Sequence, residues 1–282
     1  MCIRDSYGTH LAQVDLAYDT RSAQLCSTDA KTVAAPKQAN LADPVIARIN
    51  SDAEAARKRA DVIGAKVIGT ATAPITTASD AQDSSFGSSV RNRESAMSNM
   101  VAQMFKDTLG KEDPNFIGIQ NPGGTRASLQ SGEITYKDAA LVLPFANSLM
   151  TTTVTGEQFK QVLEEQWQHD EKGQVPSRPF LSLGLSNNVS YTYDENLPEG
   201  QRITSVWVNG KPIDPKASYT VGSGSFLING GDNFHTLAKG SRPVDTGKVD
   251  LDTWVSWIKD QGKLTPSFAR RGVSVSAKRV SD

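Results

Sequence analysis

Short segments of alternating apolar and polar residues run through the second half of this 282-residue chain and limit the folds open to it. They are VSYTYD (189–194), ITSVWV (203–208) and ASYTVGSGSF (217–226). This alternation is typical of strands that bury one face of a sheet. Asn209-Gly210, just before KPIDP, is a hairpin-type turn. The chain is therefore expected to contain antiparallel hairpins.

Helical patterns separate these strands from the rest of the chain. Thr155 and Gln158 form a capping box, and an apolar stripe follows at Phe159, Val162, Leu163 and Trp167. Further helices are predicted over about 94–108 and from Leu251 to Gly262, and NFIGIQ (115–120) is predicted as a strand. Hairpins with segregated helices indicate an α+β fold, with mixed sheets and packed helices, rather than alternating βαβ units.

Charge and composition exclude several classes of protein. The chain has 30 basic and 31 acidic residues, so no polyanion-binding surface is indicated and nucleic acid is not an expected partner. No apolar stretch is long enough to span a membrane, and no signal peptide is recognisable. The cysteines, Cys2 and Cys26, form no C-x-x-C pattern, so the redox compartment stays open.

The N-terminal region has an unusual organisation. MCIRDS fits no structural element, whereas YGTHLAQVDLAYD (7–19) alternates like a strand. A single strand needs sheet partners, and none is visible nearby upstream. Our hypothesis is that residues 1–42 are the end of a domain, followed by a linker.

A long helix is predicted from Asp43 to Gly64. Asp43 is a suitable N-cap, Pro44 suits the first helical position, and Gly64 is a terminator. About twenty residues span ~30 Å, which would suit a connection between two bodies. The alternative is an ordinary surface helix with a stripe of small residues.

Common catalytic motifs are absent. The chain contains no P-loop, no G-x-G-x-x-G, no G-x-S-x-G and no H-E-x-x-H. Its histidines, His10, His169 and His235, are far apart in sequence, so we expect no complete metal centre. Asp232 with His235 would be half of a site at most.

Three segments together resemble the C-terminal domain of the 5'-nucleotidase family. They are RNRESAMSNM (91–100), NPGGTRASLQSGEITYKDAALVLPFAN (121–147) and SFLINGGDNF (225–234). The resemblance spans about Val67 to Val273 and implies a substrate-binding domain over 65–276, an interdomain helix over 43–64 and a tail at 277–282. Residues 7–19 resemble the closing strand of the family's metallophosphatase domain.

The resemblance also implies what this chain lacks. The family's dimetal motifs should precede Tyr7 and are absent, so the chain is expected to be a fragment that binds no metal and is inactive alone. Two divalent metal ions would belong to the parent enzyme, which hydrolyses phosphate esters of nucleosides. Family members are usually exported, which implies an extracellular, periplasmic or cell-surface location.

The family's phosphate-binding positions fall on arginines. By motif, Arg91 and Arg126 would hold the substrate phosphates, and Asn121 takes an amide position beside the ribose or phosphate. Guanidinium groups suit this role because their paired donors match phosphate oxygens. The alternative for each arginine is a solvated surface charge.

The family's base- and ribose-binding positions also have counterparts. Phe145 and Phe226 match the aromatic residues that sandwich the base, Asn147 can address the base edge, and Asp232 matches the carboxylate that accepts the ribose hydroxyls. The alternative is that both phenylalanines are core residues.

Several functions therefore stay open. The substrate would be a nucleoside phosphate or a nucleotide sugar. The chain could instead be a noncatalytic nucleoside-recognition module. It could also come from a UDP-sugar hydrolase, cyclic-phosphodiesterase or thiosulfohydrolase-like relative.

Overall fold

The computed structural model describes residues 10–36, 38–79, 90–170 and 172–276 and shows two compact units. The first comprises residues 1–60 and the second residues 61–282. MCIRDS, Cys2 and the predicted tail at 277–282 lie outside the described residues.

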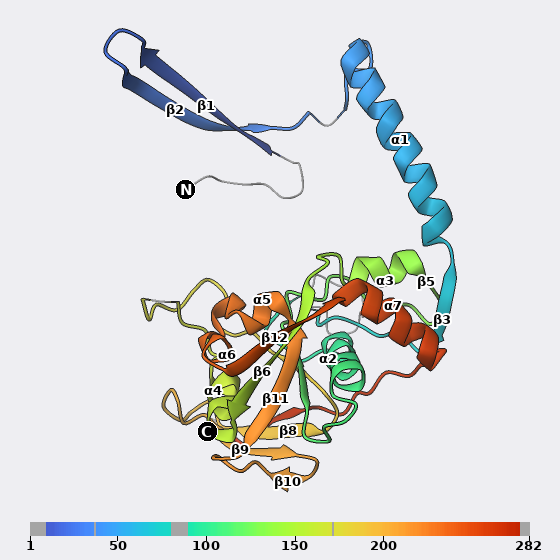
Figure 1. Ribbon diagram of the computed structural model, residues 1–282, viewed down its shortest axis with the longest axis vertical. Helices are drawn as coiled ribbons and strands as arrows, with labels where there is room; N and C mark the ends of the chain where they lie inside the picture. Colours follow the sequence, from blue (N-terminus) through green and yellow to red (C-terminus); the bar gives the residue numbers. More distant parts are fainter. Residues whose placement is uncertain (1–9, 37, 80–89, 171, 277–282) are drawn as a thin grey trace, which may run out of the picture. The chain divides into compact units, whose positions relative to one another are not determined.

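The first unit contains a β-hairpin. Strands β1 (His10–Asp19) and β2 (Gln24–Ala34) pair antiparallel, with Val14 opposite Ala30 (Figure 1). The predicted strand is confirmed, and its partner lies downstream, in a segment that the sequence pattern does not predict as a strand. QLCSTDAKTVA alternates too weakly to be recognised as a strand, yet it supplies the partner.

Helix α1 (Pro44–Gly64) begins and ends where the sequence predicts. The Asp43 carboxylate accepts hydrogen bonds from the backbone N–H groups of Val45 (2.8 Å) and Ile46 (3.3 Å), which caps the first turn. Gly64 is the buried residue of the helix.

The second unit contains three sheets, which confirms the α+β prediction. The five-stranded sheet has the order β12-β6-β11-β4-β7, the four-stranded sheet β10-β9-β8-β14 and the three-stranded sheet β13-β3-β5. The strands of the first are β12 (Ser241–Val249), β6 (Ser148–Thr155), β11 (Ser218–Gly224), β4 (Ile117–Gln120) and β7 (Gly184–Leu185). Those of the second are β10 (Lys211–Pro212), β9 (Ile203–Val208), β8 (Val189–Tyr193) and β14 (Gly272–Ser274). Those of the third are β13 (Lys263–Leu264), β3 (Val67–Ala71) and β5 (Gly132–Thr135).

Helices cover these sheets and enclose two cores (Figure 1). The larger helices are α2 (Ala96–Leu109), α3 (Tyr136–Val142), α4 (Gly156–Glu164) and α7 (Asp250–Gln261). Short helices follow β11, namely α5 (Ser225–Ile228), a 3₁₀ turn (Gly231–Asn233) and α6 (His235–Ala238). One core lies around α4 and the other around α2 and α7.

Two sequence predictions need correction. Helix α4 ends at Glu164, so Trp167 follows the helix and packs its ring edge-on against Phe180, with centroids 4.9 Å apart. Residues 70–89, rich in Thr, Ser, Ala and Asp, are predicted from the sequence as an extended loop. This segment instead begins inside strand β3, and Ile75 forms a bridge to Leu129. The remainder of that predicted loop, residues 80–89, lies outside the described residues.

Candidate functional site

One edge of the five-stranded sheet gathers the segments that carry the predicted site. Strands β4 and β11 are parallel, with Ile117 opposite Val221, so both end at the same edge. Strand β6 runs antiparallel to β11 and therefore begins there, with Leu149 opposite Gly224. The loops after β4, after β11 and before β6 meet at this edge, which is where loops commonly form ligand sites.

The backbone of Arg91 is held near this edge by the segment that leads into β7. Its backbone carbonyl accepts a hydrogen bond from the Ser182 N–H (2.8 Å), two residues before Gly184, which pairs with Gln120 at the end of β4. A Cβ added to Gly123 would lie 2.8 Å from Arg91 Nη1. The guanidinium group therefore rests against the glycine turn because no side chain intervenes.

The turn after β4 is fixed by hydrogen bonds. Asn121 is buried, its carbonyl accepts from the Gly124 N–H (3.0 Å), and its Nδ2 donates to Asp232 Oδ2 (2.7 Å). The Arg126 N–H donates to the Val142 carbonyl (2.9 Å). The amide–carboxylate bond directly joins two predicted site residues, Asn121 and Asp232.

The loop that carries Asp232 has an unusual backbone. Asp232 (φ 54°) and Asn233 (φ 61°) both adopt left-handed conformations, which are uncommon outside glycine. Asn233 Nδ2 donates to Gln168 Oε1 (3.0 Å), and Thr236 Oγ1 donates to Glu165 Oε1 (2.6 Å). The segment after α4 therefore holds this strained loop in place.

The predicted aromatic residues are exposed rather than buried. Phe145 is 56% and Phe226 is 49% accessible, so the alternative that both are core residues is wrong. The Arg126 guanidinium carbon lies 6.0 Å from the centroid of the Phe145 ring, within cation–π range. A Cβ on Gly231 would meet the Phe226 ring at 2.6 Å, so this ring lies flush against the glycine backbone.

Asn147 is held from the side of helix α7. Its Nδ2 donates to Asp250 Oδ2 (3.0 Å), and its carbonyl accepts from the Asp250 N–H (3.0 Å). Burial raises the pKa of the Asp250 carboxyl, and the hydrogen bond from Asn147 opposes that rise. This reciprocal pair fixes Asn147 at the entrance to β6.

The structure thus brings several predicted site residues close to one another. Arg91 touches the turn after Asn121, Asn121 bonds to Asp232, and Arg126 faces Phe145. Asn147 and Phe226 share the sheet edge through the register of β6 and β11. Sequence reasoning missed the supporting residues Glu165, Gln168 and Asp250.

Metal-binding chemistry finds no support among the described residues. No group of three or more His, Cys, Asp or Glu side chains within them could hold a metal ion. The described segments therefore do not fit a dinuclear metal centre. Likewise, no described helix combines the length and apolar character needed to cross a membrane.

Comparison with known proteins shows what this chain is similar to. The sequence profile described as "5'-nucleotidase, C-terminal domain" matches residues 67–239, more than half of the chain. A probable 5'-nucleotidase of Treponema pallidum is 35% identical over 127 residues, which cover 43% of this chain and 21% of that protein. The NAD 5'-nucleotidase of Haemophilus influenzae is 32% identical over 155 residues, 51% of this chain and 25% of that protein.

A solved structure shows the same fold. The 5'-nucleotidase precursor from Thermus thermophilus superposes with a TM-score of 0.66 at 23% identity, covering 96% of this chain and 51% of that chain. The present chain therefore spans about half of this solved relative and about a quarter or less of the two curated ones.

Proposed function

Because the chain belongs to the family of 5'-nucleotidase C-terminal domains, we propose that it is the nucleotide-binding domain of a phosphoric ester hydrolase that converts nucleoside 5'-phosphates to nucleosides. The observation that carries this proposal is the sheet edge, where two exposed rings, two arginines and an amide–carboxylate pair meet. These groups match the ring, phosphate and hydroxyl chemistry of a nucleotide.

Each part of a nucleotide has a suitable partner at this edge. The exposed faces of Phe145 and Phe226 would stack on the base, because any base presents a π-face. Arg91 and Arg126 would bind the phosphate through charge-assisted hydrogen bonds. Asp232 would accept the ribose hydroxyls, with its position set by Asn121. Asn147 would address the base edge.

Hydrolysis would require groups that the described residues do not supply. We propose that two divalent metal ions belong to another domain of the parent enzyme, that residues 1–42 derive from that domain, and that α1 connects it to the nucleotide-binding domain at 65–276. The greater length of the relatives supports this arrangement. An extracellular or periplasmic location is part of the same proposal, and cell fractionation would test it.

Calorimetric titration with AMP, adenosine and UDP-glucose tests the binding function. We expect saturable AMP binding that weakens by about 5- to 150-fold in Phe226→Ala, the equivalent of one lost stacking interaction of ~1–3 kcal/mol. Val62→Ala is the control, because Val62 is also an exposed apolar side chain (74%) and belongs to α1, outside the loops of the candidate site.

The comparison of ligands separates the alternatives. Tighter binding of UDP-glucose than of AMP would identify a UDP-sugar hydrolase relative, and equal binding of adenosine and AMP would identify a nucleoside-recognition module. Absence of nucleotide binding by a folded chain would overturn the proposal.

A further inference from the structure

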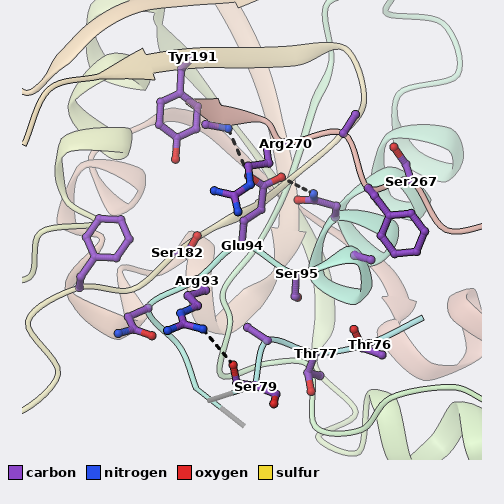
Figure 2. A pocket seen from close by; sticks show the side chains of 18 of the residues that line it. Thr76, Thr77, Ser79, Arg93, Glu94, Ser95, Ser182, Tyr191, Ser267 and Arg270 are labelled. Atoms are coloured by element: carbon purple, nitrogen blue, oxygen red, sulfur yellow. Dashed lines mark hydrogen bonds between the residues drawn. The ribbon is translucent and has the colours of Figure 1, made fainter. Parts of the chain in front are cut away.

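A pocket lies beside the segment that carries Arg91, because the lining residue Ser182 donates its backbone N–H to the Arg91 carbonyl (2.8 Å). Its volume is about 670 Å³, within the range of small-molecule sites. It opens where the segment before α2, strand β8 and the segment before β14 meet (Figure 2). None of the seven predicted site residues lines this pocket.

The walls of the pocket are fixed by a single carboxylate. Glu94 accepts hydrogen bonds from Asn99 Nδ2 (2.6 Å) and from the backbone N–H groups of Arg271 (2.8 Å) and Gly272 (3.3 Å) (Figure 2). These bonds tie the start of α2 to the chain about 177 positions later. They also occupy both oxygens of Glu94, the acidic residue among the described residues of the pocket wall.

Two guanidinium groups line the same pocket, and neither forms an ion pair with a carboxylate of the described residues. Arg93 and Arg270 are both exposed, and they come from the two segments that Glu94 joins (Figure 2). Arg93 Nη1 donates to the Ser79 carbonyl (3.4 Å). Within the described segments, no ion pair involves either arginine. Two uncompensated cations in a concave site favour an anionic ligand.

Aromatic rings form the remaining wall. Tyr191 and Tyr193 lie with ring centroids 5.9 Å apart, and Gly272 permits this packing because a Cβ there would meet the Tyr191 ring at 2.4 Å. Phe268 lies in the segment before β14, and its side chain is 74% accessible. Phe268 lines the pocket in the same segment as Arg270 and offers an exposed surface on which a planar ring can stack.

We propose that this pocket binds a small organic anion in which a planar ring carries a carboxylate or phosphate group. The oxyanion would meet Arg93 and Arg270, and the ring would lie against Phe268 and Tyr193. The inference rests on this pocket alone and stands independently of the nucleotide-binding proposal.

Calorimetry of the full chain with phenyl phosphate and benzoate provides the test. We expect saturable binding of at least one of them, weakened about tenfold or more in Arg270→Gln, because a hydrogen bond to a charged group contributes ~1.5–3 kcal/mol. Phe268→Ala should weaken both ring-bearing probes but leave the weaker binding of inorganic phosphate unchanged. The probe that binds more tightly shows whether the pocket prefers a phosphate or a carboxylate group.

A matched variant separates this pocket from the nucleotide site. Arg126→Gln should reduce AMP binding while leaving phenyl phosphate binding unchanged, and Arg270→Gln should do the reverse. The proposal is overturned if neither probe binds to the folded chain, or if Arg270→Gln and Arg93→Gln leave their binding unaltered. The proposal is also overturned if Arg126→Gln abolishes binding of the probe, because the probe then occupies the nucleotide site.

Discussion

At the scale of single residues, Gly123 leaves room for the Arg91 guanidinium because it has no side chain. Alanine at this position would place Cβ 2.8 Å from Arg91 Nη1 and 3.0 Å from Cζ. The guanidinium is the flexible end of a side chain, so we expect it to move away while the fold persists. Gly123→Ala should therefore weaken AMP binding by about tenfold, the equivalent of one charge-assisted hydrogen bond, without altering adenosine binding.

Gly224→Ala provides the comparison for this prediction. A Cβ at Gly224 would make an ordinary 3.5 Å contact with Asn147 Cβ, so no group need move. If calorimetry shows equal losses for AMP and adenosine in Gly123→Ala, Arg91 does not contact the phosphate.

Protonation of Glu165, which supports the loop that carries Asp232, should make the unfolding free energy depend on pH. Burial raises the pKa of its carboxyl, while hydrogen bonds from Thr236 oppose the rise. The folded chain therefore retains a proton on Glu165 at pH values where the unfolded chain has released it. This contribution to stability is fully present below the unfolded pKa and is lost as the pH rises through the folded pKa.

We expect Glu165→Gln to remove that dependence. As the pH rises above the ordinary pKa of a glutamate, about 4.3, the unfolding free energy of the wild type should fall relative to that of the variant. Urea unfolding at several pH values measures the difference, with Glu133→Gln as an exposed control on β5. Parallel pH profiles for wild type and Glu165→Gln would show that the pKa of Glu165 is not raised.

At the scale of elements, helix α2 packs directly on the backbone of strand β4. A Cβ on Gly118 would lie 1.9 Å from the Ala102 carbonyl oxygen, which belongs to the helix backbone and cannot rotate away. Gly118→Ala should lower the unfolding free energy by ~1–3 kcal/mol or more, as overpacking does. Chemical denaturation measures this loss, and Gly224→Ala should show little change. An unaltered Gly118→Ala variant would mean that α2 does not approach β4 so closely.

Local signals explain which elements could be predicted. The Asp43 cap, the Thr155–Gln158 capping box and the Asn209–Gly210 turn, with φ values of 53° and 70°, involve neighbours in sequence, and each occurs as expected. Strand β6 reads SLMTTTVT, which lacks regular alternation, and its partners β11 and β12 lie far along the chain. Its pairing is a tertiary property that local patterns do not encode.

In the candidate site, too, some features could be predicted from local sequence and others could not. Motifs indicated seven candidate binding positions and their order, and the gathering of the loops after β4 and β11 follows from the parallel pairing of these strands. The roles of Glu165 and Gln168 could not be predicted, because their contacts with Thr236 and Asn233 arise only when the segment after α4 packs against the loop after β11.

At the scale of the whole molecule, binding a nucleotide and hydrolysing it require different groups. Base stacking and phosphate contacts lower the free energy of the complex, but cleavage of a phosphate ester also requires an activated nucleophile. The described residues offer no cluster of ligands that could bind a metal ion and thereby activate water. Under the proposal that the metal ions belong to another domain of the parent enzyme, we expect nucleotide binding and nucleotide hydrolysis to separate in this chain.

We expect the 282-residue chain to bind AMP but to release no phosphate from it. The assay compares phosphate release with Mn²⁺ and with EDTA, using a preparation whose AMP binding has been verified by calorimetry. Verified binding is essential, because an unfolded chain would also be inactive. Phosphate release that depends on Mn²⁺ and disappears with EDTA would contradict the prediction and would place a catalytic metal site within these 282 residues.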